Sequence, residues 1–215
     1  MAKQKSHDFK NAEKRILISA EVAFATYGFD GASIRLISKK SGVNVSMIGY
    51  YFGSKENLYL NIFKQRLKEV IEEIQYFEKF QCSPAEKLKA YLAAYMKRVS
   101  GRRNFHRLLH HELISDRHPA IVAELSATRQ HLHTFLQNII HAGIEEGCFG
   151  QIDASLLTLN ILALIRAVFI DRLTCIHLPE STENDLSRIT MDYVLSLLRV
   201  NDHYPSKTNH EQVHS

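Results

Sequence analysis

The sequence predicts an all-α protein of about nine helices, and three observations support this fold class. Apolar residues recur every three or four positions along most of the 215-residue chain. Residues that start or stop helices separate these stretches, with Ser, Asn, Asp or Pro before them and Gly after them. No stretch shows the credible apolar–polar alternation of a half-buried strand. We therefore expect a small N-terminal group of three helices followed by a larger helical bundle.

Three short helices are expected in the first quarter of the chain. The apolar positions of 16–27 repeat at helical spacing, and Gly28 follows as a residue that tolerates the left-handed conformation after a last turn. Ser33 can cap a second helix that ends near Gly42, and Asn44 can cap a third. Two short helices joined by so tight a link are typical of a helix-turn-helix unit.

Six further helices are expected beyond this group. Their apolar stripes occupy residues 55–77, 88–99, 105–114, 121–140, 154–171 and 186–197. Ser83 and Glu86 form a capping box around Pro84, which fits the first helical position, and Asp153 can cap the helix that follows it. Pro179 and Ser181 introduce the last helix. The polar segment 201–215 is expected to be a flexible tail.

Positive charge is concentrated near the N-terminus. Residues 1–60 hold nine Lys and Arg against five Asp and Glu, whereas the rest of the chain holds eighteen of each. Such asymmetry indicates an N-terminal module that meets a polyanion, although a solvated basic face without a partner would have the same composition.

Other classes of protein are disfavoured. The chain has three widely spaced cysteines, which suit neither a disulfide framework nor a zinc set: Cys82, Cys148 and Cys175. The polar start carries no signal peptide, and the most apolar stretch, 156–170, is too short to span a bilayer. We therefore expect a cytoplasmic protein without a membrane partner, a cofactor, a metal site or catalytic residues.

One segment carries a family resemblance. The run GFDGASIRLISKKSGVNVSMIGYYFGSKENLY, Gly28 to Tyr59, resembles the DNA-binding domain of the TetR family of bacterial transcriptional regulators. The matching positions occur in order at fixed spacings: Gly28-Phe29, Ser33, Ile37, Gly42-Val43, Tyr50-Tyr51-Phe52, Ser54-Lys55-Glu56 and Leu58. The resemblance implies a DNA-binding domain over 10–60, and a helical effector-binding and dimerisation domain over 61–200.

The resemblance also implies roles for individual residues. The expected DNA-binding residues are Ser33, Arg35, Val45, Ser46, Met47, Gly49, Tyr51 and Lys55. Tyr50 and Phe52 are expected to pack inside the unit. Gly49 and Val45 depart from the usual larger or polar residues, so that base reading would depend on Ser46 and on apolar contacts to thymine methyl groups. Phosphate contacts and DNA shape would supply the rest of the DNA recognition.

The larger domain is expected to bind a small-molecule effector and to form a homodimer. Helix 154–171 is apolar on nearly all sides, so it suits either a subunit interface or the centre of a monomer core. Candidate effector-binding residues are Phe63, Tyr91, Tyr95, Asn160 and Arg166, although aromatic residues at helical spacing are more often core residues. Arg166 would need an acidic partner if buried. The expected function is that of a repressor that leaves a palindromic operator when an effector binds.

The histidines suggest an alternative to a DNA-binding regulator. Seven of the twelve lie within 106–141, and His106 and His110 are one helical turn apart, a spacing that can chelate a metal. With Glu112 they suggest a helical metal-binding enzyme or a metal sensor, but the zinc-protease pattern fails because no second histidine follows at the required position. A redox sensor and a ligand-free architectural DNA binder are further alternatives.

Overall fold

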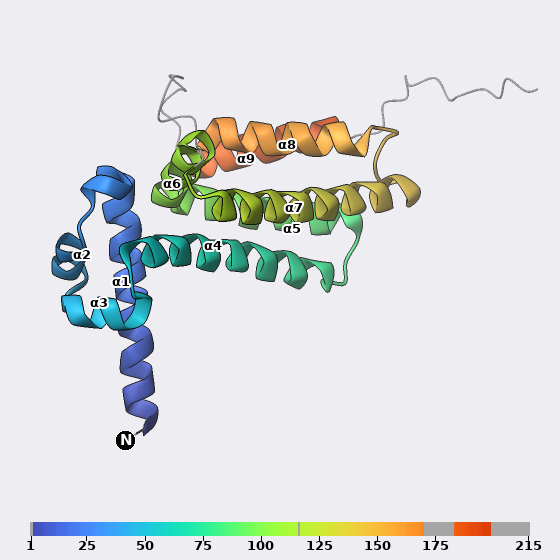
Figure 1. The fold of residues 1–215 in the computed structure, drawn as a ribbon. Helices are drawn as coiled ribbons and strands as arrows, with labels where there is room; N and C mark the ends of the chain where they lie inside the picture. The colour runs from blue at the N-terminus through green and yellow to red at the C-terminus, as the bar shows by residue number, and fades with distance from the viewer. Residues whose placement is uncertain (1, 116, 170–182, 199–215) are drawn as a thin grey trace, which may run out of the picture. The chain divides into compact units, whose positions relative to one another are not determined.

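The computed structural model describes residues 2–115, 117–169 and 183–198, which form nine α-helices and no strand (Figure 1). The helices are α1 (Ala2–Gly31), α2 (Ile34–Ser41), α3 (Val45–Phe52), α4 (Lys55–Glu78), α5 (Pro84–Gly101), α6 (Arg103–Ser115), α7 (Pro119–Glu145), α8 (Ala154–Phe169) and α9 (Glu183–Leu197). The predicted all-α fold class is therefore confirmed. The predicted helix start at Pro179 and Ser181, and the predicted tail 201–215, lie outside the described residues.

Most predicted helix boundaries are confirmed by the hydrogen bonds at the helix ends. Ser83 and Glu86 form the expected capping box, in which the Ser83 N–H donates to Glu86 Oε2 at 3.1 Å and the Glu86 N–H donates to Ser83 Oγ at 3.4 Å. Asp153 Oδ1 accepts from the Leu156 N–H at 2.9 Å, as expected of an N-cap. Gly28 leaves the helical conformation with φ 72°, but one further turn continues α1 to Gly31.

The described helices pack into two compact units. The first contains the chain up to Lys79 together with Lys97–Leu132, and the second contains Phe80–Met96 together with the described residues from His133 onwards. The first unit therefore includes α4, α6 and the first part of α7 in addition to α1, α2 and α3. The predicted domain boundary between residues 60 and 61 stays a prediction.

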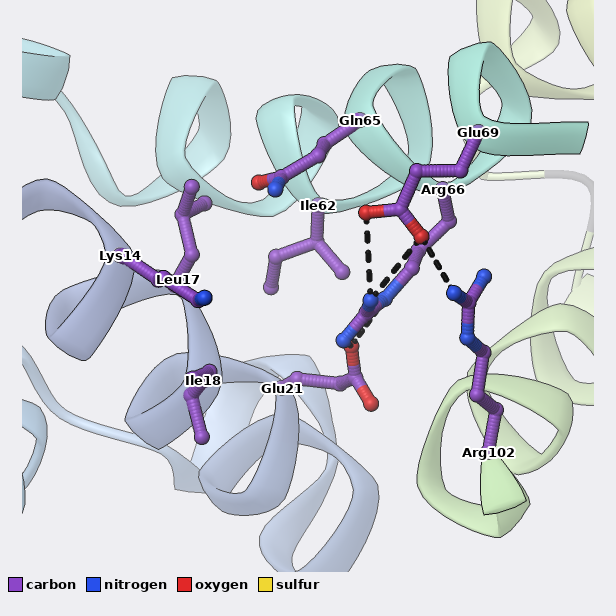
Figure 2. Close-up of a pocket in the computed structure, with 9 residues that line it drawn as sticks. All are labelled: Lys14, Leu17, Ile18, Glu21, Ile62, Gln65, Arg66, Glu69 and Arg102. Carbon is purple, nitrogen blue, oxygen red and sulfur yellow. Dashed lines mark hydrogen bonds and ion pairs between the residues drawn. The ribbon is translucent and has the colours of Figure 1, made fainter. Parts of the chain in front are cut away.

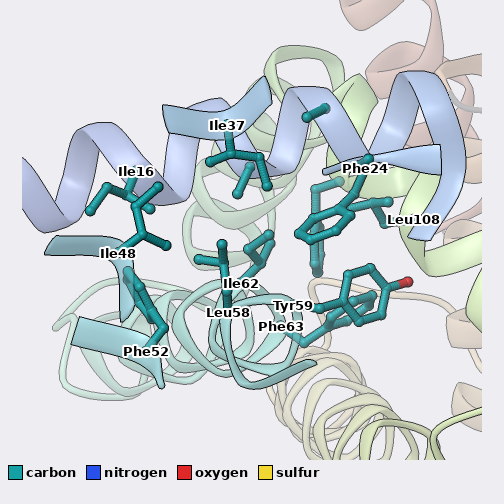
Figure 3. Close-up of a cluster of buried hydrophobic side chains, with 14 of the residues drawn as sticks. Ile16, Phe24, Ile37, Ile48, Phe52, Leu58, Tyr59, Ile62, Phe63 and Leu108 are labelled. Atoms are coloured by element: carbon teal, nitrogen blue, oxygen red, sulfur yellow. The ribbon is translucent and has the colours of Figure 1, made fainter. Parts of the chain in front are cut away.

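One hydrophobic core holds the first unit together (Figure 3). Ile16 and Phe24 of α1 pack in it with side chains from α2, α3, α4 and α6, among them Ile37, Ile48, Phe52, Leu58, Phe63 and Leu108. Each fully buried side chain of this size contributes about 1.5–3 kcal/mol relative to its exposed state. The core fixes α3 against α1 and α4, and therefore fixes which face of α3 meets solvent.

The second unit has its own core and contains the side-by-side helices α8 and α9 (Figure 1). Tyr91 of α5 is fully buried and packs edge-on against Phe135 of α7, with ring centroids 4.8 Å apart. The Phe149 ring packs directly on Gly143, where a Cβ atom would overlap with it. Within the described residues, no helix is both long enough and apolar enough to cross a bilayer.

Candidate DNA-binding surface

The link between α2 and α3 is fixed by local hydrogen bonds. Ser33 Oγ accepts from the Leu36 N–H at 3.1 Å and so caps α2. Gly42 ends α2 with φ 66°, a conformation that costs glycine little because it lacks a Cβ. Asn44 Oδ1 then accepts from the Met47 N–H at 2.8 Å and caps α3. Across the link, the Ser38 hydroxyl donates to the Val43 carbonyl at 2.7 Å. The orientation of α3 relative to α2 is therefore set by short polar contacts.

The outer face of α3 consists of Val45, Ser46, Gly49 and Tyr50, all of which are exposed. The Ser46 hydroxyl donates to Asn44 Oδ1 at 2.7 Å, and a Cβ added to Gly49 would meet no atom within 4 Å. Ile48 and Phe52, four residues apart, take the opposite, buried face. We refer to these four exposed residues as the α3 outer face.

Tyr50 corrects one sequence-based expectation. We expected it to pack inside the unit, but its side chain is 78% exposed. Helical geometry explains the difference, since the buried face is already occupied by Ile48 and Phe52, and Tyr50 lies between them on the other side. Phe52 is buried as expected. Tyr50 therefore extends the α3 outer face beyond the residues that the sequence singled out.

The other predicted DNA-binding residues lie around this face. Arg35 is exposed on α2, as are Lys39 and Lys40. Met47 and Tyr51 are half-buried and pack against the hydrophobic core, so that only part of each side chain is accessible. Desolvation, followed by the charge of Glu13, raises the pKa of Tyr51.

Lys55 has partners within the protein. Its Nζ donates to the Asp30 carbonyl at 3.2 Å and lies 4.7 Å above the centre of the Phe29 ring. These contacts connect the start of α4 to the end of α1. These contacts already restrict the lysine side chain. It therefore loses less conformational freedom when it binds an anion.

The five candidate effector-binding residues do not share one environment. Phe63 is fully buried in the core of the first unit, next to Tyr59 and Phe105. The other four belong to the second unit: Tyr91, Tyr95, Asn160 and Arg166. Tyr91 is buried there and Tyr95 half-buried, with their rings stacked. Asn160 and Arg166 of α8 are exposed, and their role in effector binding stays a prediction.

The metal-site alternative is not favoured by the geometry. His110 is exposed, whereas Glu112 is 1% exposed and faces the opposite side of α6. Burial, followed by the charges of Arg98 and Arg102, lowers the pKa of His106 to about 4. The described residues contain no group of three or more His, Cys, Asp or Glu able to hold a metal ion. Cys82 and Cys148 are free thiols, and Cys175 lies outside the described residues.

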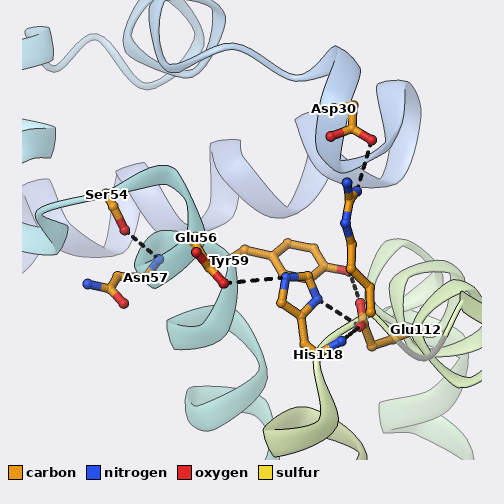
Figure 4. Close-up of polar contacts among 8 residues, drawn as sticks. Asp30, Ser54, Glu56, Asn57, Tyr59, Glu112 and His118 are labelled. Atoms are coloured by element: carbon orange, nitrogen blue, oxygen red, sulfur yellow. Dashed lines mark hydrogen bonds and ion pairs between the residues drawn. The ribbon is translucent and has the colours of Figure 1, made fainter.

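Glu112 instead forms a buried polar cluster that the sequence did not predict (Figure 4). Its Oε2 accepts from the Tyr59 hydroxyl at 2.8 Å, while Oε1 accepts from the His118 backbone N–H at 2.9 Å. The His118 Nδ1 lies 2.8 Å from the same oxygen, and its Nε2 lies 4.0 Å from Glu56. The cluster joins α4 and α6 to the residue that precedes α7.

An exposed, locally basic surface on a capped helix-turn-helix defines the class of protein: a helix-turn-helix DNA-binding regulator. Comparisons with known proteins agree. Residues 16–62 match the family model "Bacterial regulatory proteins, tetR family", and residues 81–169 match the model "Tetracyclin repressor-like, C-terminal domain". The chain belongs to the TetR family of bacterial transcriptional regulators.

Two known regulators are similar to parts of this chain. The chain is 35% identical over 66 residues to the HTH-type transcriptional repressor AcnR of Corynebacterium glutamicum, a match that spans 29% of this chain and 35% of that repressor. It is 25% identical over 154 residues to the HTH-type transcriptional regulator RutR of Escherichia coli K12, covering 71% and 72% of the two chains.

Solved structures share the fold. The transcriptional regulator FadR from Bacillus subtilis, solved in complex with stearoyl-CoA, superposes with a TM-score of 0.66 at 20% identity, over 86% of this chain and 99% of that one. A TetR-like transcriptional regulator from Rhodococcus sp. RHA1 has the same TM-score at 18% identity, over 86% and 93% of the two chains.

Proposed function

We propose that the protein is a cytoplasmic transcriptional repressor that binds a palindromic DNA operator as a homodimer and is released by a small-molecule effector. The observation that carries the DNA-binding part is the α3 outer face, which is exposed and rigidly capped beside the cationic side chains of α2. An α-helix of this kind fits the major groove of B-DNA.

Within this proposal, side chains divide into two roles. Ser46, Gly49, Val45 and Met47 meet base edges, because they lie on or beside the α3 outer face. Ser33, Arg35, Tyr51 and Lys55 contact phosphates on either side of the groove, where charge and hydroxyl groups position a protein without reading sequence. The DNA-binding domain covers 10–60, and the domain over 61–200 serves dimerisation and effector binding.

Exposed apolar side chains support the homodimer. Leu156 and Leu159 of α8, and Ile189 and Tyr193 of α9, are each more than half exposed although the two helices lie side by side. A two-fold axis at these helices would bury the four side chains in a four-helix interface. Two recognition helices about 34–36 Å apart would then match successive major grooves of a palindrome.

The effector part of the proposal rests on the family and on the second unit. FadR from Bacillus subtilis was solved with stearoyl-CoA, which shows that this fold can hold a large ligand. In the second unit, Tyr91 and Tyr95 are the aromatic candidates for an effector site, with Asn160 and Arg166 as further candidates. Phe63 is a separate candidate within the first unit. Binding to a dimer with wider helix spacing would shift the population away from the DNA-bound form.

The experiment that tests the proposal is selection of random duplex DNA on the purified full-length protein. We expect enrichment of a palindrome whose half-sites are one turn of B-DNA apart. Enrichment of a single half-site without symmetry would contradict the homodimer, and a steep salt dependence without any sequence preference would indicate an architectural binder instead. An effector is then sought by release of the selected duplex. Unchanged binding across a broad ligand screen would contradict the ligand switch alone.

A further inference from the structure

The first unit contains a cavity of about 400 Å³ between α1 and α4, which also reaches the turn before α6 (Figure 2). This volume lies within the range of small-molecule sites. The lining residues all belong to the first unit, so the cavity is separate from the effector candidates in the second unit. We call it the α1–α4 cavity.

One side of the α1–α4 cavity is closed by ion pairs. Arg66 lies 2.8 Å from Glu21 and 3.2 Å from Glu69, and Arg102 lies 2.6 Å from Glu69. Burial alone would lower the pKa of Arg66, but the carboxylates of Glu21 and Glu69 outweigh it and raise the pKa. Two acids and two arginines therefore neutralise each other along this side.

Two polar groups of the lining remain available. Lys14 of α1 and Gln65 of α4 both line the cavity, and neither has an ion pair or a side-chain hydrogen bond to another described residue (Figure 2). Lys14 gives the lining an excess of one positive charge over the paired groups. An ammonium and a side-chain amide on two helices can both donate to a single carboxylate.

The remaining wall is apolar. Leu17 and Ile18 of α1 present accessible apolar surface to the cavity, and Ile62 of α4, which is 2% exposed, lines it beneath them. We propose that the α1–α4 cavity is a binding site for a small amphipathic carboxylate, whose head group is held by Lys14 and Gln65 and whose short apolar chain covers Leu17, Ile18 and Ile62. A ligand in this site bridges α1 and α4, the two longest helices of the first unit.

The apolar wall sets the ligand class. A bare anion such as acetate would satisfy Lys14 but leave the apolar wall in contact with water. A neutral amide of the same length would cover the wall but lose the charge-assisted hydrogen bond. Both should bind more weakly than the carboxylate that combines the two features.

The test uses the full-length protein with isotope-labelled isoleucine methyl groups and hexanoate as the probe, without DNA. We expect saturable shifts of the Ile18 and Ile62 methyl signals, with a Kd on the order of 1 mM. Hexanamide and acetate should each need at least about tenfold higher concentrations, about 1.4 kcal/mol in binding free energy. Equal binding of hexanoate, hexanamide and acetate would overturn the proposal.

Matched variants locate the site. Lys14→Gln should raise the Kd for hexanoate at least about fivefold, and Gln65→Leu should raise it by a smaller factor. Lys64→Gln removes the same charge from an exposed position of α4 outside the lining and should leave the Kd unchanged. Shifts confined to Ile161 in the second unit, or a Kd insensitive to Lys14→Gln, would overturn the assignment without affecting DNA binding.

Discussion

Replacement of Glu112 by alanine should destabilise the protein strongly. The carboxylate is 1% exposed and accepts from three donors: the Tyr59 hydroxyl, the His118 backbone N–H and the His118 ring. Hydrogen bonds to a charged group contribute about 1.5–3 kcal/mol each, but they are not additive when they share one carboxylate. Each buried donor that is left without an acceptor costs about 1–3 kcal/mol. We therefore expect Glu112→Ala to lower the free energy of unfolding by about 4 kcal/mol.

The assay is equilibrium urea unfolding at pH 7 and a fixed protein concentration, followed by circular dichroism. Tyr59→Phe removes only one of the three donors and should cost about 1–2 kcal/mol. Glu124→Ala removes an exposed carboxylate from α7 and should change the free energy by less than about 0.5 kcal/mol. A loss below about 1 kcal/mol for Glu112→Ala would refute the reasoning, because the three donors would then have found other partners.

Four further predictions follow from the same structure. Burial lowers the pKa of His106 to about 4, so the unfolded chain takes up its proton near pH 6.5 while the folded chain does not. Stability should therefore be fully present above pH 6.5 and fall by about 3 kcal/mol towards pH 4, and His106→Leu should remove this loss in urea titrations at several pH values. Gly143→Ala should lower the melting temperature because its Cβ would overlap with the Phe149 ring, a cost of about 1–3 kcal/mol, and an unchanged melting temperature would contradict the packing. Lys55→Ala should weaken binding to every duplex and reduce the slope of log K against log salt by about one. Tyr50→Ala should weaken operator binding while leaving the melting temperature within about 2 °C, since the side chain is exposed.

Local chemistry made much of the fold predictable. Ser33 and Asn44 were expected as N-caps, and each forms its hydrogen bond to the backbone three residues further on. The capping box at Ser83 depends on residues only three positions apart, so no tertiary contact needs to be known. Helix type and many boundaries follow from such short-range terms, but α1 begins at Ala2 and is therefore not the short helix that the sequence predicted.

The candidate site was less predictable because exposure depends on packing. The three aromatic residues 50–52 are chemically alike, and only the placement of Ile48 and Phe52 against α1 and α4 decides that Tyr50 meets solvent. Glu112 continues the apolar stripe of Phe105 and Leu108 at helical spacing, a signal that this acid is buried. Its partners, Tyr59 and His118, come from other helices and could not be read from the sequence.

Gly49→Glu tests most directly whether the α3 outer face binds duplex DNA. Because a side chain at this position meets open space, the variant should fold normally but place a carboxylate against the phosphates and base edges. Fluorescence anisotropy with the selected duplex should show at least about a thirtyfold loss of affinity, or ~2 kcal/mol. Gly101→Glu, which adds the same charge at another exposed glycine, should bind as tightly as the unmodified protein. Equal affinity of the Gly49→Glu variant would contradict the central claim.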